Sequence, residues 1–153
     1  MKKFLLALLT AVTAAALFCG AAASVATYSA SYDAPAGIST IVVQDSSAAV
    51  ILQAADIDHM RADYTYTSSY AFESSKLYDF AVAGSTLTVT KTQEPNASLL
   101  IQSQDTLSCT LTLQIPRQTL ATITVSTTND SITLDGVSAQ TASLTTDNGR
   151  IEV

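Results

Sequence analysis

The sequence predicts an all-β domain, a β-solenoid-like stack of short strands with repeats of about 19 residues. Three observations support this class. The composition is rich in Thr, Ser and Val and poor in Gly and Pro, which favours strands. Apolar and polar residues alternate over several stretches, as they do in half-buried strands. The last segment repeats itself, because residues 126–134 (STTNDSITL) align with residues 145–153 (TTDNGRIEV).

A hydrophobic export segment occupies residues 1–26, ahead of the strands. Lys2 and Lys3 precede an uncharged apolar run, which is the pattern of a signal peptide. Small residues near its end offer cleavage sites, whereas a run of this length also fits a membrane anchor. Lipid attachment at Cys19 is a third alternative. We therefore expect an exported protein with one β-strand-repeat domain over residues 27–153.

The charge and the cysteine content of residues 27–153 limit which partners and which stabilising bonds the domain can have. Five cations face all thirteen acids once Lys2 and Lys3 are set aside, which gives a net charge near −8 and argues against nucleic acid as a partner. Cys109 is the only cysteine beyond the export segment. No intramolecular disulfide can form there, so packing and backbone pairing must stabilise the domain.

Several strands can be placed in order along the chain. Residues 61–70 (RADYTYTSSY) alternate charge, tyrosine and threonine, which predicts a long strand with one wetter face. The same alternation recurs around residues 87–89. Residues 106–115 (TLSCTLTLQI) place their apolar side chains on one face, and Pro116 ends the strand because it has no backbone donor. Another strand begins near Leu120, and no helix is expected after the export segment.

The repeat predicts how the last strands stack. Asn129-Asp130 and Asp147-Asn148-Gly149 separate short apolar strands, and residues of these types let a chain turn a corner. A fainter third copy occupies residues 40–52. A spacing of seven residues recurs in all three copies, between Val43 and Val50, Val125 and Ile132, and Leu144 and Ile151. A unit this small must stack on its neighbours to bury its apolar face. An antiparallel β-sandwich is the alternative, because alternation alone does not distinguish coils from hairpins.

The sequence ends at an apolar repeat position, Val153, with no cap or turn after it. We expect an open strand edge at this end of the domain. Three arrangements would account for it: the N-terminal strands cover the edge, another chain pairs with it, or the sequence is a truncated piece of a longer repeat. Truncation is the expectation.

The pattern over residues 111–153 resembles a family of exported bacterial β-strand-repeat proteins, named "putative adhesins" or domains of unknown function. The shared features are an apolar strand that ends in proline, here Ile115-Pro116, and then strands separated by Asn-Gly or a similar pair. Residues 146–151 (TDNGRI) match closely, whereas Asp130 stands where glycine is expected and predicts a different turn. The resemblance implies the fold and a place in the cell envelope. It brings no catalytic or ligand-binding residues.

Four polar residues form the densest candidate cluster for a metal ion: Asp56, Asp58, His59 and Asp63. Carboxylates and imidazole are ligands for divalent ions. Strand alternation separates the first and second residues from the other two, so we expect a solvated loop leading into a strand. Asp130 and Asp147 are stacked by the repeat, but the Gly-rich nonapeptide of calcium-binding β-rolls is absent. Turn chemistry is the expected role of both.

The remaining candidates favour structural roles. Cys109 lies on an apolar strand face and is expected to be a buried, unreactive thiol. Four tyrosines are candidates for a sugar-stacking surface, but we expect them to be strand residues half buried against the sheet: Tyr64, Tyr66, Tyr70 and Tyr78. Residues 96–98 (NAS) fit a glycosylation acceptor, which carries little weight in a bacterial protein. His59 is the only histidine, which argues against a Ser-His-Asp mechanism.

The sequence thus predicts a non-enzymatic protein of the cell envelope or surface, with no catalytic residues, cofactor or metal. Adhesion to an unknown protein or glycan is the expected role, and the membrane is contacted only through residues 1–26 if they are retained. A self-assembling structural protein that pairs through the C-terminal edge is the first alternative. A secreted carbohydrate-active enzyme is the second.

Overall fold

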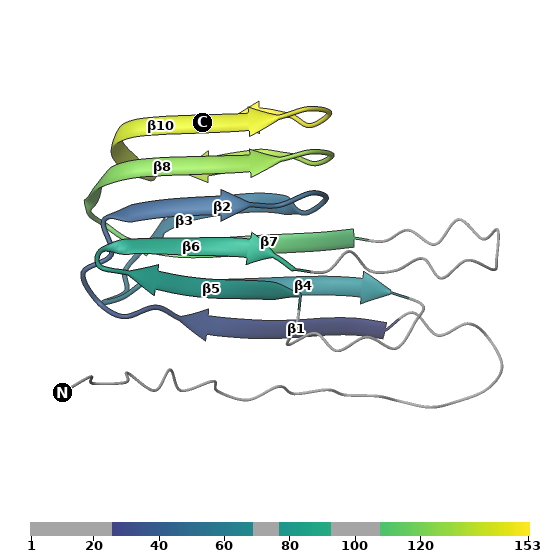
Figure 1. Cartoon of the computed structure of the whole chain (residues 1–153), viewed down its shortest axis with the longest axis horizontal. Helices are drawn as coiled ribbons and strands as arrows, with labels where there is room; N and C mark the ends of the chain where they lie inside the picture. Colours follow the sequence, from purple (N-terminus) through teal and green to yellow (C-terminus); the bar gives the residue numbers. More distant parts are fainter. Residues whose placement is uncertain (1–25, 69–76, 93–107) are drawn as a thin grey trace, which may run out of the picture.

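The computed structural model describes residues 26–68, 77–92 and 108–153, and these form eleven strands and no helix. Two sheets face each other across an apolar interior (Figure 1). The strands are β1 (Ala26–Asp33), β2 (Thr40–Gln44), β3 (Ala49–Ala55), β4 (Arg61–Ser68), β5 (Tyr78–Ala83), β6 (Thr86–Lys91), β7 (Ser108–Pro116), β8 (Thr119–Thr127), β9 (Ile132–Asp135), β10 (Ser138–Thr146) and β11 (Ile151–Glu152).

The sheets are built from stacked coils, each with one strand in either sheet. One sheet has the order β1-β4-β7-β3-β9-β11 and the other has the order β10-β8-β2-β6-β5. Parallel pairing joins the four coils β6/β7, β2/β3, β8/β9 and β10/β11 in that spatial order. This confirms the predicted β-solenoid-like stack.

The register matches the repeat read from the sequence. In one sheet Val43 lies opposite Val125, and Val125 lies opposite Leu144. In the other sheet Val50 pairs with Ile132, which pairs in turn with Ile151. The spacing of seven residues therefore carries each copy from an inward position in one sheet to an inward position in the facing sheet.

The order of the coils in space differs from their order in the sequence. The first coil, β2/β3, lies in the middle of the stack, between β6/β7 and β8/β9. Beyond β6/β7 the pairing becomes antiparallel, as β5 pairs with β6, β4 with β7 and β1 with β4. The antiparallel alternative thus holds only at this end of the molecule.

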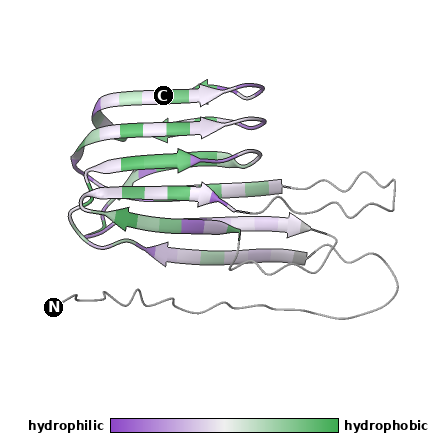
Figure 2. Ribbon diagram, viewed as in Figure 1, coloured by the Kyte–Doolittle hydropathy of each residue, from purple (hydrophilic) through white to green (hydrophobic). Residues whose placement is uncertain are grey.

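The interior is filled by the apolar face of each strand. Apolar residues alternate with polar ones along β6 and β8, β2 carries a continuous apolar run, and the corners after β2, β8 and β10 are hydrophilic (Figure 2). Ile41, Val43, Leu87, Val89 and Ile123 have no exposed surface. The residues that alternate with them, Val42, Thr88 and Thr124, lie on the outer face, where a β-branched side chain suits a strand.

The C-terminal coil remains at one end of the stack. β10 and β11 are edge strands, whereas β1 and β5 form the edges at the opposite end (Figure 1). The N-terminal strands therefore do not cover the C-terminal edge, which corrects the first of the three expected arrangements. Ile151 is 42% exposed and Val153 is 91% exposed.

None of the described residues belongs to a helix that is long and apolar enough to cross a membrane. The expected export segment lies almost wholly outside them.

Candidate functional site

A groove of about 610 Å³ opens at the end of the stack where β1 and β5 are the edge strands. It is lined by the end of β1 and the turn after it, by the loop before β4 and by β5. The lining residues are Tyr32, Asp33, Ala34, Pro35, Ala36, Asp58, His59, Phe80 and Val82. Because the two sheets separate here without a further coil, side chains from both sheets line one hollow.

Aromatic rings form the floor of the groove. Tyr32 of β1 and Phe80 of β5 are stacked, with ring centroids 4.5 Å apart and planes 7° from parallel. Phe80 also lies near Tyr64 and Tyr78, which fill the interior beneath it. Burial raises the pKa of Tyr32 above its ordinary value, so its hydroxyl stays protonated at neutral pH. Val82 adds an apolar side chain that is 37% exposed.

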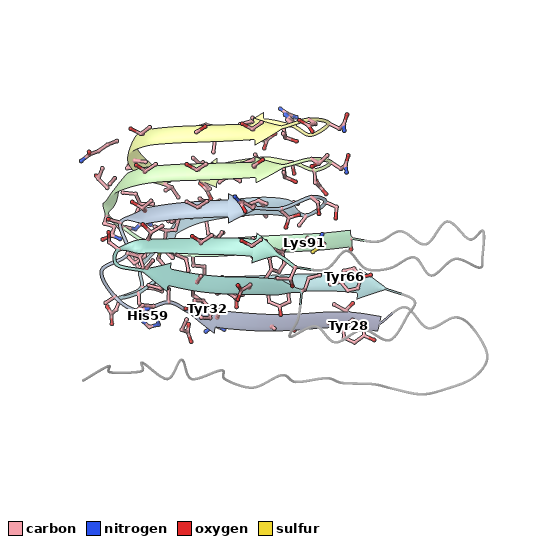
Figure 3. All side chains as sticks on the ribbon, viewed as in Figure 1. Tyr28, Tyr32, His59, Tyr66 and Lys91 are labelled. Atoms are coloured by element: carbon pink, nitrogen blue, oxygen red, sulfur yellow. The ribbon has the colours of Figure 1, made fainter. Side chains whose placement is uncertain are left out.

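Polar groups line the rim of the groove. His59 Nε2 lies 3.6 Å from Asp33 Oδ1, and Arg61 Nη1 lies 4.0 Å from the same oxygen. Tyr32 and His59 come together at the end of β1 (Figure 3). Asp58 is exposed beside them. The rim offers hydrogen-bond acceptors next to a flat aromatic surface, which is a combination that binds ligands with both apolar and hydroxyl or amine groups.

The four residues weighed as metal ligands do not converge. Asp56 pairs with Arg117 at 2.7 Å, and Asp63 accepts hydrogen bonds from Ser31 and Arg61. Asp58 and His59 lie at the groove. Across the part of the chain that the structure describes, no three acidic, histidine or cysteine side chains are grouped to hold a metal ion. As expected, residues 56–60 form a loop that leads into β4.

The structure corrects the expected burial of the tyrosines. Tyr64, Tyr66 and Tyr78 are buried in the core, more deeply than the half-buried positions preferred from the sequence. Tyr70 and the acceptor motif at 96–98 lie outside the described residues. Cys109 is buried, as predicted. Tyr32 and Phe80, which sequence alternation alone did not single out, form a partly exposed aromatic surface instead.

The predicted corners also form a ladder of asparagines. Asn148 Nδ2 donates to Asn129 Oδ1 at 3.0 Å, and Asn129 Nδ2 donates to the backbone oxygen of Ser46 at 3.2 Å. These bonds connect the same corner of three successive coils. Asp130 uses its carboxylate locally, by accepting from the Ser131 amide at 2.7 Å. Asp130 therefore has the turn chemistry expected of it.

A second polar constellation lies inside the molecule, at the ends of β2 and β6. The side chains of Asp45 and Lys91 are 0% and 2% exposed, and Lys91 Nζ lies 3.7 Å from Asp45 Oδ1. Asp45 Oδ1 accepts from the amides of Ser47 and Ala48, at 2.7 Å each. Tyr78 donates its hydroxyl proton to Asp45 Oδ2. Figure 3 shows Lys91 at the end of β6, away from His59.

The family model described as Toastrack DUF4097 matches residues 38–153, which is more than half of the chain. The chain belongs to the Toastrack family. The expected kinship with β-strand-repeat domains of unknown function is thereby confirmed.

Two solved structures resemble this Toastrack domain. One is a "putative cell adhesion protein" from Clostridium sporogenes, at 6% identity and a TM-score of 0.39, with 82% of this chain and 98% of that chain covered. The other is a "putative adhesin" from Bacteroides fragilis, at 10% identity and a TM-score of 0.41, with 83% and 62% covered. No curated protein matches the sequence.

Sequence reasoning missed both sites of the Toastrack domain. The groove depends on the antiparallel end of the stack, which brings β1 and β5 together from distant parts of the chain. The buried pair left a weak signal. Asp45 directly follows β2, at the repeat position that threonine occupies in the later copies, Thr127 and Thr146. A carboxylate at a repeat position that otherwise holds threonine is unusual. Lys91 enters this row only when β6 is paired with β2.

Proposed function

We propose that this protein is a non-enzymatic module of the cell surface that binds a ligand in the aromatic groove between β1 and β5. The observation that carries the proposal is the groove itself, which joins the Tyr32–Phe80 stack to a carboxylate rim within one hollow of about 610 Å³. The apolar run at residues 1–26 supports export. The ligand of this groove is a glycan or a protein surface.

The test compares the same substitution at the two ends of the stack. We expect Val82→Asp, in the groove, to weaken binding of a ligand found on a glycan array or an extracellular-matrix panel by about tenfold or more. Val153→Asp is the matched control, because Val153 is also an exposed valine but lies in the last coil. Equal loss in both variants would contradict the assignment of the groove. Release of cleavage products from a bound oligosaccharide would instead favour the enzyme alternative.

Self-assembly is a second candidate function, favoured by the C-terminal coil. Its strands present unpaired edges among the described residues, and Ile151 is exposed at a position where the preceding coil has the fully buried Ile132. A strand edge with exposed apolar side chains pairs readily with another chain. This function uses the end of the stack opposite the groove, so the two proposals are separable.

A further inference from the structure

The side chains of Asp45 and Lys91 form a buried ion pair, which is subject to a stronger constraint than an ion pair at the surface. Its side chains come from neighbouring parallel strands of one sheet, because Gln44 of β2 is paired with Thr90 of β6. Both are removed from water. Taking two opposite charges out of water costs free energy that their attraction only partly returns. A reaction that removes both charges would remove that cost.

The groups around the carboxylate are arranged as an acyl-transfer site would require. Two backbone amides, of Ser47 and Ala48, donate to Oδ1 at 2.7 Å each, so donors are already in place for negative charge that develops on this oxygen. The Tyr78 hydroxyl donates to the other oxygen, Oδ2. Burial, followed by the charge of Asp45, raises the pKa of Tyr78 well above its ordinary value, so this hydroxyl is protonated at neutral pH.

The amine is held beside this carboxylate. Lys91 Nζ donates to Ser47 Oγ at 2.6 Å and lies 3.7 Å from Oδ1. Ser47 thus contacts the pair twice, through its amide on the carboxylate and through its hydroxyl on the amine. Because both side chains are held side by side and are almost fully buried, the amine and the carboxylate have a larger effective concentration than the same groups in solution.

We propose that Asp45 and Lys91 join through an intramolecular isopeptide bond, so that β2 and β6 are cross-linked covalently. The ammonium gives one proton to Oδ2 of the carboxylate. The lone pair of the neutral amine then attacks Cγ, which places negative charge on Oδ1 between the two amides. The Cγ–Oδ2 bond then breaks as Tyr78 protonates the leaving oxygen. Tyr78 recovers a proton from the nitrogen. One ammonium and one carboxylate become one amide and one water, with no oxidant or other reactant.

The cross-link is tested by mass spectrometry of the folded full-length chain. Digestion should release a branched peptide that joins the segments around Asp45 and Lys91, lighter by about 18 Da than the two segments together, the mass of one water. Intact protein should show the same loss after denaturation. Detection of both segments only as separate linear peptides, from protein with a native circular dichroism spectrum, would overturn the proposal.

Three variants keep the result interpretable. Lys91→Arg removes the nucleophilic amine but keeps the charge, and should restore the full mass. Lys76→Arg is the matched control at another lysine of the same sequence and should keep the loss. Asp45→Asn should give the same amide with release of ammonia, a loss of about 17 Da. If Lys76→Arg restores the full mass, or if Lys91→Arg keeps the loss, Asp45 and Lys91 are not the bonded pair.

Discussion

At Gly149 the backbones of two neighbouring coils approach each other closely. A Cβ atom built there would lie 1.9 Å from the backbone oxygen of Asp130 and 2.7 Å from Thr146 Oγ1. Thr146 Oγ1 also accepts from the Gly149 amide and donates to that same Asp130 oxygen, at 3.0 Å each. Glycine is therefore needed at this corner because of the space, and not because of a left-handed backbone.

Gly149→Ala is expected to lower the free energy of unfolding by about 1–3 kcal/mol, since the backbone of the corner must move to make room. Urea denaturation would measure this. Thr145→Ala, at an exposed position four residues earlier, should change it by less than about 0.5 kcal/mol. Equal stability of the wild type and Gly149→Ala would show that the corner is looser than described.

Tyr64 makes the fold sensitive to alkaline pH. Burial raises the pKa of Tyr64 to about 12, and the Cys109 thiol adds to the shift. The unfolded chain ionises this tyrosine near its ordinary pKa of about 10, whereas the folded chain keeps it neutral. Stability from this group is complete below pH 10 and falls as the pH rises from 10 toward 12.

Tyr64→Phe should reduce the dependence of unfolding free energy on pH in that window. Denaturation midpoints measured from pH 8 to pH 11.5 provide the test. Tyr28→Phe is the control, because Tyr28 is only partly buried at the outer strand β1. The interpretation fails if Tyr64→Phe and wild type lose stability in parallel above pH 10.

At the level of the strands, the same repeat position has different burial in successive coils. Ile132 is fully buried in β9, whereas its partner Ile151 in β11 is 42% exposed. We expect Ile132→Ala to cost about 2–5 kcal/mol, as for a core isoleucine. Ile151→Ala should cost less than about 1 kcal/mol. The two chemical changes are identical, so the difference in unfolding free energy reports the position in the stack.

Local pattern was enough to predict most of the strands and the stacking of the C-terminal coils. Residues 126–134 and 145–153 could be aligned because they place apolar residues at the same repeat positions, and these two copies are adjacent in space. The position of β6 and β7 could not be predicted in this way. Their coil returns to pair with β2 and β3, and nothing in the alternation around residues 87–89 specifies which edge it joins.

The groove and the buried ion pair could not be predicted from the sequence for a related reason. Tyr32 and Phe80 contact each other only because β1 and β5 become the edges of facing sheets, although 48 positions of sequence separate the two rings. Asp45 and Lys91 are paired across two parallel strands. A periodic pattern reports which face of a strand is buried, but it carries no information on which distant strand lies beside it.

For the whole molecule, the two ends of the stack are expected to behave differently in solution. The last coil exposes Ile151 and Val153 beside unpaired strand edges among the described residues, so the apparent mass of residues 26–153 should rise with concentration. Light scattering after size exclusion would measure it. The double variant Ile151→Lys, Val153→Lys should stay monomeric, because charged residues block edge pairing.

Val82→Lys is the control for this experiment, since it places the same charge on an exposed valine at the groove end. It should leave the concentration dependence unchanged. A constant monomer mass for the unmodified chain would remove the self-assembly candidate and leave the binding role unaffected.

The central place of the first coil has a consequence for how the nascent chain matures. Strands β2 and β3 are made early, yet both of their neighbours come later in the sequence, β6/β7 on one side and β8/β9 on the other. A polypeptide that emerges from its N-terminus must therefore carry its future centre with both lateral edges unpaired until β6 and β7 have followed, and with one edge unpaired until β8 and β9 have followed. Such distant pairings make folding slow, and native structure is expected to form after synthesis of the chain rather than alongside it.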